Sequence, residues 1–244
     1  MKKLIFLFLS FIVLTALLPQ NLMAAPPVVL SDAEVVSHKN WEVWSHVNYK
    51  DTEDQEVYKV PTIEVIYGIF PHVEVSLEAT FIVEKADGDG VDGIDSIATQ
   101  VKVLALEEGK SYPQIAMAMQ YEVPTDDQKE RLDWSDNVWT PAISLQKHFG
   151  KTLFITQVKY YIDSKWRYGA DVFYPIDERF MFVSEVYADD FVHSEDKDEL
   201  NFRLGFKYQF MEKAKVFFAA GRSLLTAKDN RPELETNGGI MFEF

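Results

Sequence analysis

Apolar and polar residues alternate along most of the chain from Trp41 onward. In segment 200–210 the even positions carry Leu, Phe, Leu, Phe, Tyr and Phe, while the odd positions carry Asn, Arg, Gly, Lys and Gln. Segments 73–83 and 166–174 alternate in the same way. Successive side chains of a β-strand point to opposite faces, so this period predicts strands with one apolar and one polar face.

Clusters of Gly, Pro, Asp and Asn divide the pattern into twelve segments. The predicted strands are 41–49, 60–69, 73–84, 94–107, 113–124, 138–149, 152–162, 165–174, 179–190, 200–210, 214–224 and 235–244. Short connections alternate with longer acidic ones, except for the short connection at 163–164, which falls on the long side. Short periplasmic turns and long external loops are typical of bacterial outer-membrane barrels. We therefore predict an all-β, transmembrane, antiparallel up-and-down barrel of twelve strands, because closure leaves no strand edge unpaired in lipid.

The amino-terminal segment predicts export. Lys2 and Lys3 precede a mostly apolar stretch that ends before the small residues Ala24 and Ala25. This is the pattern of a signal peptide, for which we expect residues 1–24. Residues 25–40 show no clear period and are expected to form a periplasmic tail or a short plug, and residues 41–244 the barrel. The predicted location is the outer membrane of a Gram-negative cell envelope.

Composition narrows the chemistry. The chain contains no cysteine, which excludes disulfides, thiolate metal sites and a lipid anchor on an amino-terminal Cys. Its formal net charge is −15, and loss of two lysines and no acids with the signal peptide would make it −17. Such acidity argues against nucleic acid as a partner, because its phosphates need cations. It is compatible with a path for cations.

The carboxy terminus predicts both assembly and lipid contact. The chain ends Gly-Gly-Ile-Met-Phe-Glu-Phe, with Phe242 and Phe244 at alternate positions. A last strand of this kind resembles the signal that the barrel assembly machinery recognises. Aromatic residues also concentrate near predicted strand ends on the apolar face, as in the two girdles that flank the lipid band of such barrels. Expected partners are therefore outer-membrane lipids and lipopolysaccharide, the assembly machinery and a small-molecule solute.

The polar face is expected to line the lumen, and its charges differ between the two halves of the chain. The first strands supply glutamates, and later strands supply lysines and arginines, so an acidic wall would face a basic wall and orient polar solutes. If residue 69 pairs with residue 73, Glu64 lies opposite Glu78. The residues predicted to line the pore are Glu42, Glu64, Glu74, Glu78, Glu84, Lys102, Lys159, Arg167, Arg203, Lys207 and Lys215.

Two stretches resemble a known family. Residues 64–74, Glu-Val-Ile-Tyr-Gly-Ile-Phe-Pro-His-Val-Glu, resemble the early E-x-x-Y-G hairpin of outer-membrane barrels of the MetA pathway of phenol degradation family. Residues 94–106, with Lys102, and 113–125, ending Pro124-Thr125, are similar to that family's next hairpin. Ile94-Asp95-Ser96 stands where the family has a Gly-Asp pair. The resemblance implies an outer-membrane channel or transporter, in places linked to uptake of aromatic compounds.

The sequence offers little support for hydrolysis or for a calcium-binding loop. A barrel lipid hydrolase needs a Ser and a His in hydrogen-bond reach, but Ser144 and His148 on one strand face should lie roughly 13 Å apart. The run Asp87–Gly93 fails the calcium-loop pattern, since position twelve is Ala98. Loose binding of divalent cations there remains a hypothesis. We expect no catalytic residues, metal site or cofactor.

The functional hypothesis is a channel or transporter for small solutes, with aromatic or hydrophobic compounds implied by the resemblance. A twelve-stranded barrel lies between eight-stranded barrels, whose interior is filled, and sixteen-stranded ones, whose interior is open. A sealed barrel with a structural or interaction role is therefore the alternative, and the lipid hydrolase is a third.

Overall fold

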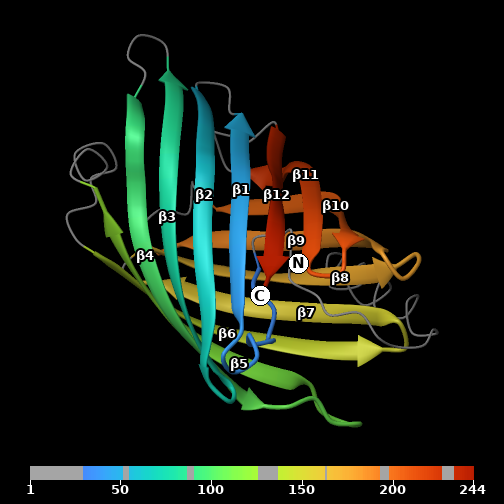
Figure 1. The fold of residues 1–244 in the computed structure, drawn as a ribbon. Coiled ribbons are helices and arrows are strands. Elements are labelled where there is room, and N and C mark those ends of the chain that lie inside the picture. The colour runs from blue at the N-terminus through green and yellow to red at the C-terminus, as the bar shows by residue number, and fades with distance from the viewer. Residues whose placement is uncertain are drawn as a thin grey trace.

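A computed structural model of the chain contains twelve β-strands (Figure 1). It describes residues 30–51, 55–86, 91–125, 137–162, 164–192, 198–226 and 234–244, and the predicted signal peptide lies outside these ranges. The strands are β1 (Trp41–Asp51), β2 (Gln55–Phe70), β3 (Val73–Ala86), β4 (Val91–Leu106), β5 (Gln114–Pro124), β6 (Val138–Phe149), β7 (Thr152–Tyr161), β8 (Lys165–Pro175), β9 (Phe180–Phe191), β10 (Glu199–Met211), β11 (Ala214–Thr226) and β12 (Leu234–Glu243). No helix in these ranges is long and apolar enough to cross a membrane.

The strands form one closed antiparallel barrel in which each strand pairs with its neighbours in sequence. β12 pairs with β1 to close the ring, in a register that matches Trp44 with Met241. Reciprocal backbone hydrogen bonds between Trp41 and Phe244 extend this seam to the carboxy terminus. The predicted fold class and strand number are confirmed. In Figure 1, β1 to β4 stand upright in front, and the strands of the far wall cross behind them at a steep angle.

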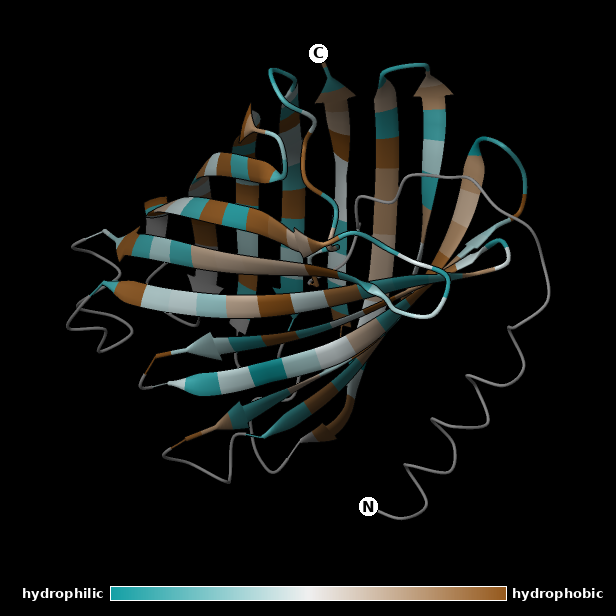
Figure 2. Ribbon diagram, turned by 90° about the horizontal axis from the view of Figure 1, so that it is seen from below, coloured by the Kyte–Doolittle hydropathy of each residue, from teal (hydrophilic) through white to brown (hydrophobic). Residues whose placement is uncertain are grey.

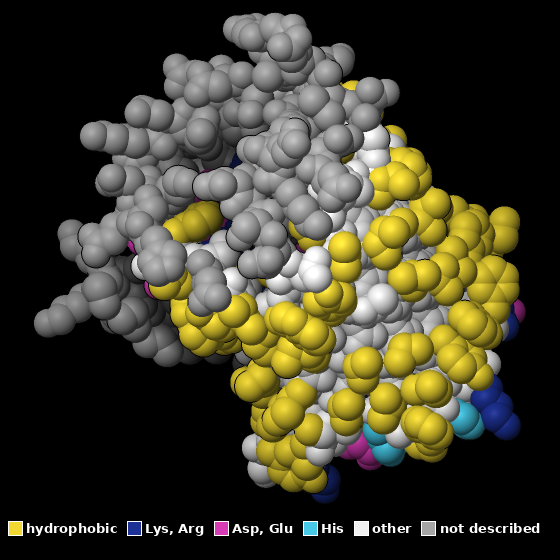
Figure 3. All heavy atoms as spheres, turned by 90° about the vertical axis from the view of Figure 1, so that its left-hand side faces the viewer, with side chains coloured by type: hydrophobic (Ala, Val, Ile, Leu, Met, Phe, Trp, Pro, Cys, Tyr) yellow, Lys and Arg dark blue, Asp and Glu magenta, His cyan; other side chains and the backbone are white. Residues whose placement is uncertain are grey.

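The barrel has an apolar outside and a polar inside. Residues at alternate strand positions are exposed hydrophobics, among them Leu77 at 53% and Met117 at 52% exposure. Their neighbours in sequence point inward and are mostly polar. Figure 2 shows the alternation as bands of hydrophobic and hydrophilic residues along the ribbon. Apolar side chains cover most of the described outer surface in Figure 3. Such an exterior is costly in water and is what a bilayer requires of a closed sheet.

Aromatic side chains pair across strands on the outer face near the barrel ends. At the end with short turns, the rings of Trp41 and Tyr67 lie 4.2 Å apart. At the opposite end, ring centroids lie 4.5 Å apart in the pair Tyr121 and Trp139, and 4.3 Å apart in the pair Tyr160 and Trp166. Cross-strand aromatic pairs stabilise sheets, and their positions fit the predicted girdles.

The main error in the predicted boundaries concerns β2. The sequence suggested a start at residue 60 after a long loop, but the strand begins at Gln55 and runs through Pro61. The ladders shift register near this proline, between His46 and Asn48 on β1 and between Lys59 and Thr62 on the β2–β3 side. A bulge accommodates a residue that cannot donate to the ladder. Residues 55–60, which precede this proline, read Gln-Glu-Val-Tyr-Lys-Val, so both faces mix polar and apolar residues and the alternation that marks a strand is lost.

The two-faced barrel predicts a strongly asymmetric response to charge. Ile97 on β4 is 47% exposed on the outer face, whereas Gln100 on the same strand borders the lumen. Ile97→Arg should lower the free energy of unfolding in lipid bilayers by up to about 2–4 kcal/mol, because a charge that faces hydrocarbon loses its hydration. Gln100→Arg is the control and should change it by less than about 1 kcal/mol. Urea titration in liposomes measures both, and equal losses would contradict the assignment of faces.

Candidate functional site

The lumen holds a cavity of about 550 Å³. Most of the residues predicted to line the pore border this cavity, namely Glu42, Glu64, Glu74, Glu78, Lys102, Lys159, Arg167 and Lys215. Arg203 and Lys207 also point inward, but they are buried in the wall and do not border the cavity. Glu84 lies in β3, and its side chain is outside the described residues.

Residues 30–40 cross the lumen before they enter β1. The backbone N–H of Leu30 donates to Glu185 at 3.2 Å, and that of Ala33 donates to Gln146 at 3.2 Å. Farther along, the N–H of Val36 donates to Glu74 at 2.6 Å. These acceptors come from β9, β6 and β3, so the segment extends from one wall to another. Lumen side chains thus replace the strand partners that this backbone lacks.

Two glutamines and a serine hold the same segment by its carbonyl groups. Gln157 and Ser144 both donate to the carbonyl of Ser31, at 3.1 and 3.0 Å. Gln114 donates to the carbonyl of Ala33 at 2.8 Å. Each such hydrogen bond contributes roughly 0.5–1.5 kcal/mol net. The alternation of apolar and polar residues predicts that these side chains face the lumen. Nothing in the sequence pattern indicates that they bind this segment.

A buried ion triad fixes the centre of the segment. Lys102 on β4 lies 3.2 Å from Asp32 of the segment and 3.1 Å from Glu74 on β3. All three side chains are buried. Breaking a buried pair leaves an uncompensated charge and is costly, so the triad holds the segment in place more firmly than the neutral contacts do.

Gly68 lets the segment approach the barrel wall. The carbonyl of Gly68 accepts from Lys39 at 2.8 Å, and its N–H donates to Asn40 at 3.1 Å. A Cβ at this position would lie 2.2 Å from the carbonyl oxygen of Ser37. The glycine of the family-like hairpin is therefore needed here for close backbone approach.

Three glutamates lie in one row of the strand ladder. Glu64 pairs with Glu78, as the sequence predicted, and Glu78 pairs with Ala98, which pairs with Glu122. All three glutamates border the cavity. No basic side chain of the described residues lies within 4.0 Å of them. Glu122 was missed by the sequence analysis, although its alternation with Tyr121 and Val123 marks it as inward-facing.

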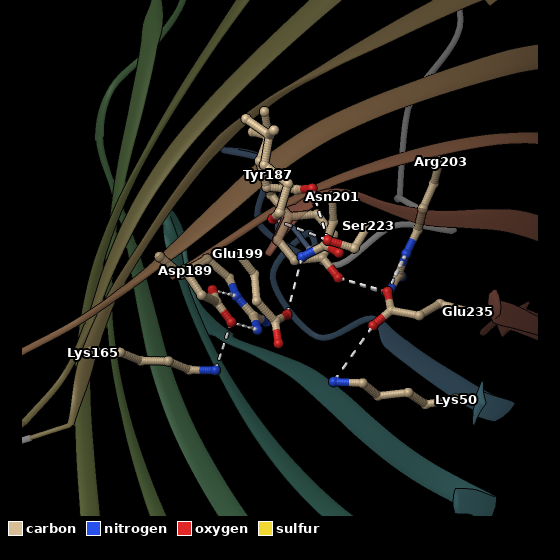
Figure 4. Close-up of polar contacts among 12 residues, drawn as sticks. Lys50, Lys165, Tyr187, Asp189, Glu199, Asn201, Arg203, Ser223 and Glu235 are labelled. Carbon is tan, nitrogen blue, oxygen red and sulfur yellow. Dashed lines mark hydrogen bonds and ion pairs between the residues drawn. The ribbon is translucent and has the colours of Figure 1, made fainter. Parts of the chain in front are cut away.

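The arginines of the far wall are paired locally. Arg167 makes two hydrogen bonds to Asp189, at 2.6 and 2.7 Å, and Lys165 reaches the same carboxylate at 2.6 Å. Arg203 binds Glu235, whose carboxylate also accepts from Tyr187 at 2.7 Å (Figure 4). The guanidinium groups of Arg167 and Arg203 lie over the ring of Tyr187, at 5.0 and 5.2 Å from its centroid.

This pairing reduces the net charge of the basic wall that the sequence predicts. Asp189 and Glu235, which the sequence analysis did not single out, neutralise the arginines, and Glu243 neutralises Lys215. The alternation of the sequence does indicate that these acids face the lumen, since they occupy inward positions of β9 and β12. Their pairing depends on strand register, which alternation alone does not give.

Part of the lumen wall is apolar. Leu153, Ile155, Phe173, Met181 and Val183 form a buried cluster on the inner face of β7 to β9, near their short turns. Trp44, Phe217 and Met241 form a second cluster on β1, β11 and β12, against which Ile66 packs. Neither cluster was predicted from the sequence. On these stretches both faces of each strand carry apolar residues, so the alternation that marks the lumen side fades.

The geometry does not assemble a hydrolytic site from Ser144 and His148. Ser144 accepts from Gln157 at 2.7 Å, and the ring Nδ1 of His148 lies 2.7 Å from Glu108. Partial burial opposes ionisation of Glu108, but hydrogen bonds from His148 and Lys147 lower the pKa of this carboxyl. Residues 87–90, which belong to the acidic run compared with a calcium loop, lie outside the described residues, as does His193.

Comparison with known proteins gives a likeness of fold. No family model matches the sequence, and no curated protein matches it. A COG4313 outer membrane channel from Pseudomonas putida F1 superposes with a TM-score of 0.64 at 15% identity, covering 89% of this chain and all of that one. The NanC porin gives 0.59 at 11% identity, covering 82% of this chain and 98% of that one. The KdgM porin gives 0.56 at 10% identity, covering 82% and 99%.

The fold is that of outer-membrane channels. The three similar structures are described as an outer membrane channel and two porins. At such identities the likeness extends to the fold alone, so the resemblance to the phenol-degradation family stays a prediction.

The arginine cluster on the lumen wall predicts a large stability effect. Arg203→Met would leave Glu235 buried with only Tyr187 and a distant Lys50, and should lower the free energy of unfolding by about 3–5 kcal/mol. Lys50→Met is the control, since Lys50 is 41% exposed and 4.0 Å from Glu235, and should cost less than about 1 kcal/mol. Adding Glu235→Gln to Arg203→Met should recover part of the loss in urea titrations. Equal effects of Arg203→Met and Lys50→Met would contradict the pairing.

Proposed function

We propose that this protein is an outer-membrane channel through which small solutes pass along the polar lumen. The observation that carries the proposal is a closed barrel with an apolar exterior that encloses a cavity bordered by charged side chains. A lipid-facing band with a wet interior is the arrangement of transmembrane β-barrel channels. The structural likeness to outer-membrane channels supports it. On this proposal the predicted pore residues that border the cavity line the solute path.

We further propose that residues 25–40 act as a short plug. The described part of this segment, residues 30–40, crosses the lumen and is bound from several strands. A segment held in this way narrows the path and sets the conductance of the resting channel. It also favours a second candidate function, a sealed barrel with a structural role, if the segment closes the path completely.

Export and assembly belong to the same proposal. Residues 1–24 would be removed as a signal peptide, and Phe242 and Phe244 would present the last strand to the assembly machinery. Phe242 and Phe244 are exposed on β12 and just beyond it, where a recognition factor could reach them before closure. Lipids and lipopolysaccharide would contact the outer surface.

Single-channel recording in planar bilayers tests the channel. The purified mature protein should give discrete conductance steps in potassium chloride, because water and ions can occupy a polar lumen. Absence of steps at all voltages, with the protein shown to be folded by its heat-modifiable migration in gels, would support the sealed barrel. A lipase assay on the same preparation should show no activity above the detergent blank. Hydrolysis of the lipid substrate would instead support the lipid hydrolase.

Loosening the segment should raise conductance. The double variant Gln146→Ala, Gln157→Ala removes three hydrogen bonds that the two side chains make to the backbone of Ser31 and Ala33. The conductance or the open fraction should increase several-fold, since roughly 1.5–4 kcal/mol of attachment is lost. The matched control is Gln100→Ala, Gln120→Ala, which removes the same side-chain atoms from the cavity wall without touching the segment. An equal increase in the control would indicate widening alone and would contradict the plug.

A further inference from the structure

The cavity contains charges of both signs that the protein itself leaves unpaired. Four basic groups at its border have acidic partners within 4.0 Å: Lys59 with Asp95, Lys102 with Asp32 and Glu74, Arg167 with Asp189, and Lys215 with Glu243. Lys159 on β7 also borders the cavity, but no acid of the described residues lies within this distance of it. Lys159 pairs in the ladder with Arg167, another cation, and its charge acts on Asp171 of β8 only from beyond ion-pair distance.

The acidic side of the same cavity is the glutamate row. Glu64, Glu78 and Glu122 border the cavity, and the hydroxyl groups of Ser76 and Thr80 are neutral hydrogen-bond partners of Glu64 and Glu78. The positive charge of Lys159 acts electrostatically on the carboxylate of Glu78. Both side chains border the same cavity, but they are too far apart to form an ion pair. A cation at one side and an anion at the other are thus held apart across the cavity.

An apolar surface adjoins the glutamate row. Trp44 is the ladder partner of Glu64, and Trp44 packs against Phe217 at 5.6 Å between ring centroids. Trp44, Phe217 and Ile66 all border the cavity. A solute that reaches the glutamates can therefore bury a short hydrocarbon part against these side chains, and an ammonium group can lie against the indole face of Trp44.

We propose that the cavity binds a small dipolar solute, with its ammonium group at Glu64, Glu78 and Glu122 and its carboxylate at Lys159. The inference rests on the proposed channel function and names the class of solute. A volume of about 550 Å³ is in the range of small-molecule sites. A plain cation would leave Lys159 without a counter-charge, and a plain anion would meet three carboxylates. A zwitterion of a few carbon atoms satisfies both sides, because its net charge is zero and its dipole follows the field of the lumen.

The test uses four probes of similar size: 4-aminobutyrate as the zwitterion, butylammonium as the cation, butyrate as the anion, and erythritol as the neutral solute. Millimolar 4-aminobutyrate should reduce the single-channel potassium current more than any other probe. In a proteoliposome swelling assay, which suits net-neutral solutes, 4-aminobutyrate should enter faster than erythritol. Both measurements use the full mature chain.

Variants on the two sides of the cavity separate the roles. Lys159→Gln and Glu78→Gln should each raise the half-blocking concentration of 4-aminobutyrate on the order of tenfold, the effect of losing one charge-assisted hydrogen bond. Lys159→Arg should retain the block, which guards against a folding defect in the first variant. Gln100→Ala is the matched control on the same cavity wall and should leave the block unchanged.

Each outcome decides one of the two proposals. No conductance and no swelling with any probe would overturn the channel itself. Conductance with equal block by 4-aminobutyrate and erythritol would overturn only the dipolar site. A stronger block by butylammonium that persists in Lys159→Gln would show that the acidic row acts alone, and would also overturn it.

Discussion

The structure depends on the pairing of every strand edge. A backbone N–H or C=O that faces hydrocarbon without a partner costs several kcal/mol, so a sheet in lipid has to close on itself. Here the seam between β12 and β1 achieves closure, and it extends to the reciprocal hydrogen bonds of Trp41 and Phe244. Once the ring is closed, strand alternation fixes which side chains face lipid and which face the lumen.

Inside the lumen, the corresponding cost is that of burying a charged side chain without a partner. A buried ion requires a partner, and most basic groups of the wall have one nearby: Arg167 has Asp189 on the adjacent strand, and Arg203 has Glu235 two strands away, across Gly221. These pairs stiffen the wall and remove net charge from it. Lys159 and the glutamate row lack such a partner among the described residues, and they border the cavity. Water or a solute can solvate them there, which is why they are the groups able to act on a solute.

The segment 30–40 connects the barrel to its proposed function. Its backbone would lack hydrogen bonds in an apolar pore, but lumen glutamines and glutamates provide them, and Lys102 binds the side chain of Asp32. The attachment consists of several modest contacts and one buried ion pair, spread over strands on different sides of the ring. Such an arrangement keeps the segment ordered inside the barrel and allows its contacts to be weakened singly, which a covalent or purely apolar plug would not allow.

The sequence alone determined the fold class, the number of strands and the facing of most side chains, because a period of two is a local property that any strand expresses. It also predicted that Glu64 lies opposite Glu78, although its premise that residue 69 pairs with residue 73 is wrong: Phe70 pairs with Val73, and a register shift between Gly68 and Phe70 restores the expected row. Only the tertiary structure decided that residues 30–40 enter the lumen, that Asp189 and Glu235 neutralise the arginines, and that apolar clusters interrupt the polar wall. These features join residues far apart in the chain, and their geometry follows from closure and strand stagger, which no local pattern records.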